Sequence, residues 1–212
     1  MQGIILKILQ DPRLGFAIDC SSGLIVSRIE QYLQLLVKWN RKMNLTSEKD
    51  PKEILCRHVF DSLQYLRAIT PDLQVMDIGS GAGFPGIPLK IIYPDLTLVM
   101  VESQRKRCSF LETVIRDLGL PQVEVINSRA EEVSGSYSGQ FDAVVFRAVS
   151  SVQACFDLGA RFVSPGGKVV LKKSPEEEWQ KLDSGFLLKK EETILSYHGL
   201  ASSLLVFEKC FT

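Results

Sequence analysis

Apolar residues in the first third of the chain recur at spacings of three and four, which is the period of an amphipathic helix. One such stripe runs through residues 23–44 and consists of Ile25, Ile29, Leu33, Leu36 and Val37. A second helix is predicted from Asp50, because this side chain can cap a first turn in which Pro51 takes the first position. The Thr-Pro-Asp run at 70–72 ends the helical pattern, so we assign residues 1–70 to an N-terminal helical extension.

Beyond residue 71 the period changes, and short apolar runs alternate with stretches of helical spacing. The expected strands are 75–79, 97–102, 123–127, 141–146 and 167–173. Strands that alternate with helices predict a parallel sheet with helices on both faces. Two further runs, 187–197 and 203–209, leave no room for a helix between them and predict an antiparallel hairpin. The sequence therefore predicts an α/β domain at 71–212, with a Rossmann-like, mostly parallel sheet that ends in this hairpin.

A glycine-rich segment follows the first expected strand. Gly81–Gly86 reads G-x-G-x-x-G, and Gly79 precedes it. Open parallel sheets bind their ligands at the carboxyl ends of the strands, where this loop is expected. The next strand ends about twenty residues further on in Glu102, the position at which an acidic side chain binds ribose hydroxyls. Sites for NAD and sites for S-adenosylmethionine share both features.

Three details favour S-adenosylmethionine over NAD. A dinucleotide site binds its pyrophosphate on free N–H groups at a helix start, whereas Pro85 and Pro88 remove two of these donors. Asp77 brings negative charge towards the loop, which repels a pyrophosphate and suits the ammonium and sulfonium groups of S-adenosylmethionine. The closing hairpin is similar to that of class I methyltransferases. We therefore predict S-adenosylmethionine as the cofactor.

Composition and charge narrow the remaining possibilities. The 212 residues carry a formal net charge of zero, so a nucleic acid would have to be bound by local basic patches. The five cysteines have neither metal-site nor disulfide spacing, which indicates reduced thiols, no metal ion and a cytoplasmic protein. No apolar run approaches the ~18 residues of a membrane span. We expect a monomer that does not contact a membrane.

Several segments carry a more specific pattern than the glycine loop alone. They are WNRKMNLTS at 39–47, RHVFDSL at 57–63, DIGSGAGFPGIPL at 77–89, SRAEE at 128–132 and RAV at 147–149. Together they resemble the bacterial RsmG family, also called GidB. The resemblance implies a class I methyltransferase that modifies N7 of a guanine in 16S ribosomal RNA, with either the naked RNA or a small-subunit ribosomal particle as its substrate.

The resemblance also implies roles for single residues. Gly79 and Phe84 match cofactor contacts, Ala130 and Glu131 match the place that holds the adenine end, and Arg147 matches an arginine at the mouth of the site. The complete set of predicted cofactor-binding residues is Asp77, Gly79, Gly81, Gly83, Phe84, Glu102, Ser103, Ala130, Glu131 and Arg147.

The methyl transfer that the resemblance implies needs no acid–base catalysis by the protein. Guanine N7 has a free lone pair, so its methylation needs no general base, and we predict that no catalytic acid or base exists. Alignment of the reactants is then the main source of rate enhancement. For the RNA we predict contacts from Arg57, His58 and Lys172. The alternative for His58 is a hydrogen-bonded structural role, and the basic run 105–107 is equally well explained as a solvated helix face.

Three other functions remain open at this point. The chain could be a small-molecule methyltransferase that uses its helical extension as a lid, an NAD(P)-dependent enzyme, or a nucleotide sensor without catalytic activity. An open and basic site mouth would favour RNA as the substrate, whereas a closed and apolar pocket would favour a small molecule.

Overall fold

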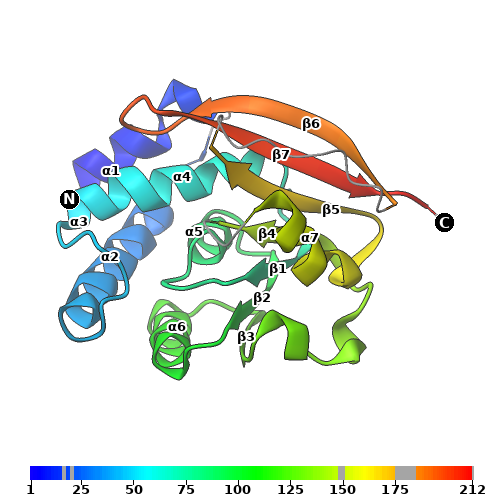
Figure 1. The fold of residues 1–212 in the computed structure, drawn as a ribbon. Helices are drawn as coiled ribbons and strands as arrows, with labels where there is room; N and C mark the ends of the chain where they lie inside the picture. The colour runs from blue at the N-terminus through cyan, green and yellow to red at the C-terminus, as the bar shows by residue number, and fades with distance from the viewer. Residues whose placement is uncertain (16–17, 20–21, 148–150, 175–184, 212) are drawn as a thin grey trace.

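A seven-stranded sheet forms the centre of the molecule (Figure 1). The computed structural model describes residues 1–15, 18–19, 22–147, 151–174 and 185–211. The sheet has the order β3-β2-β1-β4-β5-β7-β6. Its strands are β1 Gln74–Ile78, β2 Thr97–Glu102, β3 Val123–Asn127, β4 Phe141–Phe146, β5 Val163–Lys173, β6 Phe186–Leu195 and β7 Ala201–Lys209. All expected strands are present, so the predicted α/β class is confirmed.

The strand directions also follow the prediction. Strands β1 to β5 pair in parallel, and β7 runs antiparallel to both of its neighbours, β5 and β6. The start of β5 differs from the expectation, because the strand begins at Val163 rather than at residue 167. Val163 pairs with Phe141 before a register shift, and Gly166 with its φ of 76° lies in the irregular stretch.

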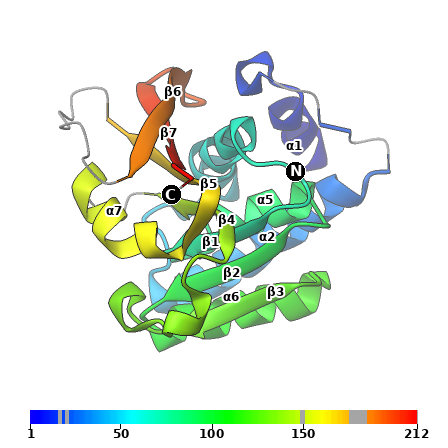
Figure 2. The same cartoon turned by 90° about the vertical axis from the view of Figure 1, so that its right-hand side faces the viewer.

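Helices cover both faces of the sheet, as the alternating pattern predicts (Figures 1 and 2). One face carries α2 Leu24–Met43, α5 Gly86–Ile92 and α6 Arg105–Leu118, and the other carries α7 Val152–Gly159. The remaining helical segments are α1 Gln2–Leu9, η1 Pro12–Leu14, α3 Pro51–Ile54, η2 Leu55–Val59, α4 Phe60–Leu63, η3 Gln64–Arg67, η4 Ala130–Glu132, η5 Gly135–Tyr137 and η6 Ala160–Phe162.

The apolar core continues across residue 70. Leu36 of α2 and Phe60 of α4 pack in one cluster with Val75 of β1 and Leu98 of β2. All four side chains are fully buried. A second cluster lies on the opposite face of the sheet and includes Phe156 of α7. The N-terminal helices therefore cover one face of the sheet and share its core.

The second predicted helix begins as expected but changes its winding. The Asp50 side chain accepts a hydrogen bond from the backbone N–H of Lys52 at 3.0 Å, and Pro51 is the first helical residue. The helical run continues to Arg67, but η2 is a π-helical turn rather than α-helix. Such turns inside helices often occur at functional sites, and this one carries Arg57 and His58.

The described residues also bear on the expectations from composition. No helix among them is long and apolar enough to cross a membrane. Cys56, Cys108 and Cys155 are buried thiols, and the half-buried Cys210 is also a thiol. Cys20 lies outside the described residues, as do residues 148–149 of the RAV segment.

The shared core predicts a single unfolding transition for the whole chain. Truncating the fully buried Leu36 to alanine leaves a cavity between α2 and the sheet face. We expect Leu36→Ala to lower the free energy of unfolding by about 2–5 kcal/mol in urea denaturation while one transition is retained. The control Leu187→Ala, at an exposed position of β6, should change it by no more than about 0.5 kcal/mol. Two separate transitions, of which only one moves, would contradict a common core.

Candidate functional site

A cleft of about 350 Å³ lies at the carboxyl ends of β1, β2 and β3. Ligand pockets in proteins span about 300–1,000 Å³. Five of the predicted cofactor-binding residues line the cleft: Gly79, Glu102, Ser103, Ala130 and Glu131. The structure therefore brings together the end of the glycine loop, the acid that ends β2 and the turn after β3.

Sequence reasoning missed several residues of the same cleft. Gln104, Arg107, Ser128, Arg129 and Leu158 also line it. Gln104, Ser128 and Arg129 lie within two residues of the end of β2 or β3, so their position after an expected strand was the available signal. Arg107 lies in the first turn of α6. Leu158 comes from α7, and nothing in the sequence links this helix to the cleft.

The carboxylate of Glu102 joins the two loops of the cleft. One oxygen accepts the backbone N–H of Gly81 at 2.9 Å, and the other accepts the N–H of Gln104 at 2.8 Å. The guanidinium of Arg107 lies 3.8 Å away. A carboxylate has about four acceptor sites, so two hydrogen bonds leave capacity for the ribose hydroxyls that the sequence predicts.

The glycines of the loop serve different purposes. Gly79, with a φ of 74°, lines the cleft. Gly83, with a φ of 95°, does not line it, and a Cβ there would lie 2.6 Å from Cγ1 of Ile87. Gly81 contributes its N–H to Glu102. Neither Gly81 nor Gly83, both predicted cofactor contacts, lines the cleft, and both shape the loop.

The start of α5 offers no free N–H groups to a phosphate. The N–H of Gly86 donates to Asp77, and that of Ile87 donates to the carbonyl of Gly83. Pro88 has no N–H, and the N–H of Leu89 donates to a carbonyl. Every donor of the first turn is thus absent or engaged, which gives a structural reason against a dinucleotide pyrophosphate.

Asp77 lies beneath the loop and not in the cleft. Its side chain is completely buried, and Oδ2 accepts the N–H of Gly86 at 3.0 Å. Oδ1 is buried without a hydrogen-bond partner. Burial raises the pKa of this carboxyl to about 7, although the hydrogen bond from Gly86 and the charge of Arg147 act in the opposite direction. The expectation that Asp77 faces the cations of the cofactor is therefore corrected: it supports the loop from below.

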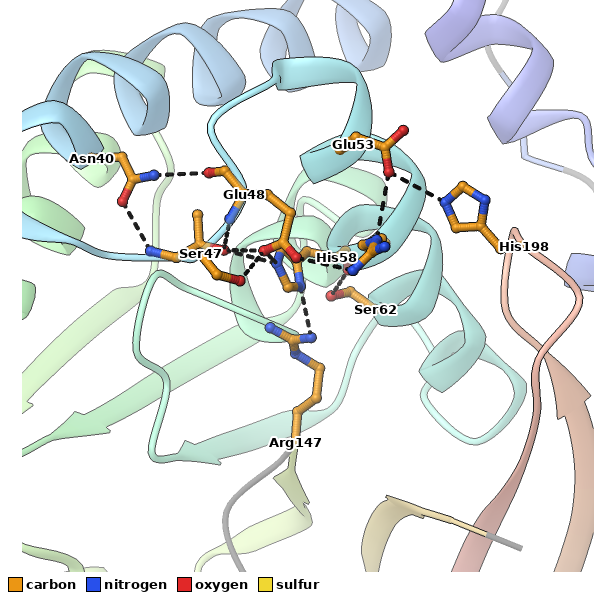
Figure 3. A network of polar contacts seen from close by, with 10 residues as sticks. Asn40, Ser47, Glu48, Glu53, His58, Ser62, Arg147 and His198 are labelled. Atoms are coloured by element: carbon orange, nitrogen blue, oxygen red, sulfur yellow. Dashed lines mark hydrogen bonds and ion pairs between the residues drawn. The ribbon is translucent and has the colours of Figure 1, made fainter.

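A second cluster surrounds Arg147, directly after β4 (Figure 3). The guanidinium carbon lies 4.9 Å from the centre of the Phe84 ring, and the Phe84 ring lies 5.1 Å from the ring of His58. One terminal N–H group of Arg147 donates to Nδ1 of His58 at 3.1 Å. Arg147 and Phe84 do not line the cleft described above, but they connect the glycine loop to the π-helical turn.

His58 is held in a single tautomer. Arginine can only donate hydrogen bonds, so Nδ1 of His58 must accept and its proton must be on Nε2. Nε2 lies 2.8 Å from Oε2 of Glu48 and 2.9 Å from the hydroxyl of Thr46. Burial, followed by the charge of Arg147, lowers the pKa of His58. The imidazole is therefore neutral and fully engaged, and the predicted RNA contact of His58 is replaced by an internal role.

The residues that hold His58 come from the segment 40–48. The buried side chain of Asn40 donates to the carbonyl of Glu48 at 2.8 Å and accepts the N–H of Thr46 at 2.9 Å. A hydrogen bond from Thr46, followed by that from His58, holds the pKa of Glu48 far below its usual range. Sequence reasoning missed these roles, although all three residues lie in or next to the WNRKMNLTS segment.

The other two predicted RNA contacts differ in their exposure. The side chain of Arg57 is 56% exposed, although its guanidinium lies 3.2 Å from Glu48 and 3.5 Å from Glu53. The ammonium of Lys172 lies 2.5 Å from Asp61, and its side chain is only 15% exposed. Lys172 therefore ties β5 to α4 and is not a free cation for RNA. No group of three metal-ligating side chains occurs in the described part of the chain.

The strand order, with its closing antiparallel hairpin, defines the fold of the class I methyltransferases. A methyltransferase of this kind from Aquifex aeolicus has a TM-score of 0.58 at 17% identity, over 75% of this chain and 93% of that one. A mutant of MtNAS, solved in complex with S-adenosylmethionine, has a TM-score of 0.60 at 16% identity, over 98% of this chain and 88% of that one. At these identities the likeness concerns the fold alone.

The chain belongs to the GidB family, rRNA small subunit methyltransferase G, whose model matches residues 25–203. The enzyme of that name from Alkaliphilus metalliredigens is 36% identical over an alignment of 216 positions, gaps included. The alignment covers 95% of this chain and 89% of the relative. The enzyme of that name from Carboxydothermus hydrogenoformans is 42% identical over an alignment of 164 positions. This alignment covers 74% of this chain and 69% of the relative. The family resemblance and the predicted methyl donor, S-adenosylmethionine, are thereby confirmed.

The buried acid beneath the loop predicts a dependence of stability on pH. The folded protein binds the Asp77 proton more tightly than the unfolded chain, in which the pKa is 3.8. Folding stability therefore falls as pH rises from about 4 to about 7. Asp77→Asn keeps an oxygen for the Gly86 N–H and does not ionise. The difference in the free energy of unfolding between Asp77→Asn and wild type should shift in favour of the variant by up to about 4 kcal/mol as pH rises from about 4 to about 7. Urea denaturation curves that differ by the same amount at pH 5 and pH 8 would contradict this.

Proposed function

We propose that the protein transfers the methyl group of S-adenosylmethionine to N7 of a guanine in 16S ribosomal RNA. Family membership supports the small-subunit RNA as substrate. The observation that carries the choice of N7 is the state of His58, whose two ring nitrogens are engaged by Arg147 and Glu48. The imidazole at this junction is therefore not available as a general base, which agrees with methylation at N7, because N7 has a free lone pair and needs none.

The described residues fit S-adenosylmethionine. Glu102 has acceptor capacity for the ribose, Ala130 and Glu131 would hold the adenine end, and Gly79 leaves room for the methionine part. When bound, the cofactor supplies a methyl group activated by a positively charged sulfur. The Arg147 guanidinium, which lies 4.9 Å from the buried Phe84 ring, would align the guanine. No residue has to accept a proton, because the N7 lone pair is free.

The RNA would be bound by cations around this edge of the sheet. Arg41 and Lys42 at the end of α2 are exposed, as are Arg105 and Lys106 at the start of α6. Arg129 is exposed beside the cleft, and the exposed Arg57 lies next to His58. We propose that these side chains contact RNA phosphates, which makes affinity fall as salt rises. We further propose that the protein acts as a monomer in the cytoplasm, on naked RNA or a small-subunit particle.

The assignment of N7 can be tested by removing that atom from the substrate. Small-subunit RNA transcribed with 7-deazaguanosine in place of guanosine has a carbon at this position and should accept no methyl group from labelled S-adenosylmethionine. Unmodified RNA, assayed both naked and assembled into particles, is the control. Transfer to the 7-deaza RNA at the rate of the control would show that another atom is methylated.

Arg147 should matter for activity more than for folding. Loss of a charge-assisted hydrogen bond costs about 1.5–3 kcal/mol, so Arg147→Ala should lower kcat/KM by roughly ten- to a hundredfold. The melting temperature without ligand should stay near that of wild type, and Arg147→Lys should recover only part of the activity. Arg116→Ala, at a side chain 72% exposed at the far end of α6, is the matched control. Full activity of Arg147→Ala, or loss through unfolding alone, would make the arginine structural.

A further inference from the structure

Two buried tyrosines of the N-terminal segment reach into the loops of the active site. We propose that Tyr32 of α2 and Tyr65 of η3 are positioning residues, through which the N-terminal helices set the glycine loop and Arg147. The proposal rests on the function proposed above for its cofactor, S-adenosylmethionine, and for the role of Arg147 in activity. Both tyrosines are fully buried, and each hydroxyl donates to a backbone carbonyl of one loop.

Tyr32 holds the glycine loop at its middle. Its hydroxyl donates to the carbonyl of Ala82 at 2.6 Å. Ala82 stands between Gly81 and Gly83, both of which have positive φ values. The Tyr32 ring also packs edge-to-face against Phe84 at 5.6 Å. One side chain of α2 therefore fixes both the backbone and an aromatic ring of the same loop.

The bond from Tyr32 has a counterpart in the bond from Asp77. A regular helical turn would pair the N–H of Gly86 with the carbonyl of Ala82, four residues earlier. The neighbouring pairs of this kind do form, from Phe84 to Ser80 and from Ile87 to Gly83. Between them, the Gly86 N–H donates to Asp77 at 3.0 Å and the Ala82 carbonyl accepts from Tyr32. Two buried side chains thus take over one helical hydrogen bond and keep the loop open.

Tyr65 acts at the other loop. Its hydroxyl donates to the carbonyl of Phe146 at 2.5 Å. Phe146 is the last residue of β4, and Arg147 follows it directly. The peptide group that leads into Arg147 is therefore fixed by a side chain from the N-terminal helices. The Arg147 guanidinium stacks on Phe84, so the two tyrosines orient two side chains that contact each other.

Both hydroxyls keep their protons under all physiological conditions. Burial raises the pKa of Tyr32 and of Tyr65 well above the ordinary value of 10.0 for a phenol. A donor that never ionises suits a carbonyl, which can only accept. Without the Tyr32 hydroxyl, the Ala82 carbonyl lacks its donor and the glycine loop can relax towards the helical pairing. Without the Tyr65 hydroxyl, the Phe146 carbonyl lacks the donor that fixes the peptide group before Arg147.

The first experiment compares Tyr32→Phe with wild type at 10 °C, on protein shown to be folded by circular dichroism. Calorimetry with S-adenosylhomocysteine should show an affinity about tenfold weaker, and KM for S-adenosylmethionine should rise by the same factor. The value of kcat at saturating cofactor should stay within about twofold. Tyr137→Phe is the control, because its hydroxyl donates to Glu124 on the surface at 2.7 Å and its loss should leave all three quantities unchanged.

The second experiment is a double-mutant cycle between Tyr65 and Arg147. Tyr65→Phe alone should lower kcat/KM about tenfold. In the Arg147→Ala background it should have no further effect, because the tyrosine acts through the arginine. A merely structural role would instead give the same factor in both backgrounds.

The outcomes separate this proposal from the proposed function. Failure of the wild type to bind S-adenosylhomocysteine would refute the cofactor assignment itself. If the wild type binds S-adenosylhomocysteine but KM is unchanged in Tyr32→Phe, only the positioning role of Tyr32 is overturned. Additive effects in the double-mutant cycle would likewise overturn only the positioning role of Tyr65. A variant that cannot be obtained folded would also overturn it for that tyrosine, since its hydroxyl would then be a requirement of the fold.

Discussion

The carboxylate of Asp77 is buried beneath the glycine loop, and the shape of the loop follows from that burial. A fully buried acid needs donors, and the donor it uses is the N–H of Gly86, at the start of α5. That choice removes the natural partner of the Ala82 carbonyl, which then accepts from Tyr32. It also engages the first N–H of α5, which is therefore not free for a phosphate. One interaction thus contributes to the preference for a cofactor without phosphate and creates the need for an N-terminal helix against the loop.

The N-terminal helices are accordingly part of the site and not a lid over it. Arg147 influences the ionisation of Tyr32, His58 and Asp77, which places its charge among side chains from three separate parts of the chain. The contact between Arg147 and His58 exists only while the imidazole is neutral, since a proton on Nδ1 would face a guanidinium. Glu48 fixes the proton on the opposite nitrogen. The segment that carries Glu48 therefore fixes, through His58, the position of the Arg147 guanidinium.

The sequence predicts the sheet and the place of the cleft well, because both depend on local patterns. Apolar runs locate the strands. The missing N–H groups of Pro85 and Pro88 distinguish S-adenosylmethionine from NAD without any knowledge of contacts. Pairings between distant residues could not be predicted in this way. The ion pair of Lys172 and Asp61 joins residues 111 positions apart. Asp77 was placed in the right segment, but the direction of its side chain depends on which face of β1 the helix α5 covers.

The burial of Lys172 and His58 has a common physical origin. Both lie at the edge of the sheet where the sequence predicts RNA contacts, yet they are largely buried and bound by acids of the N-terminal segment, Asp61 and Glu48. Of the two, only Lys172 is a cation, because the imidazole of His58 is neutral. A buried charge must be paired, whereas a cation that binds phosphate must stay exposed. The same edge cannot anchor the extension and bind RNA with the same side chains. Lys172 and His58 therefore serve the fold, and the exposed Arg57 and Arg129 are among the side chains that we propose for the nucleic acid.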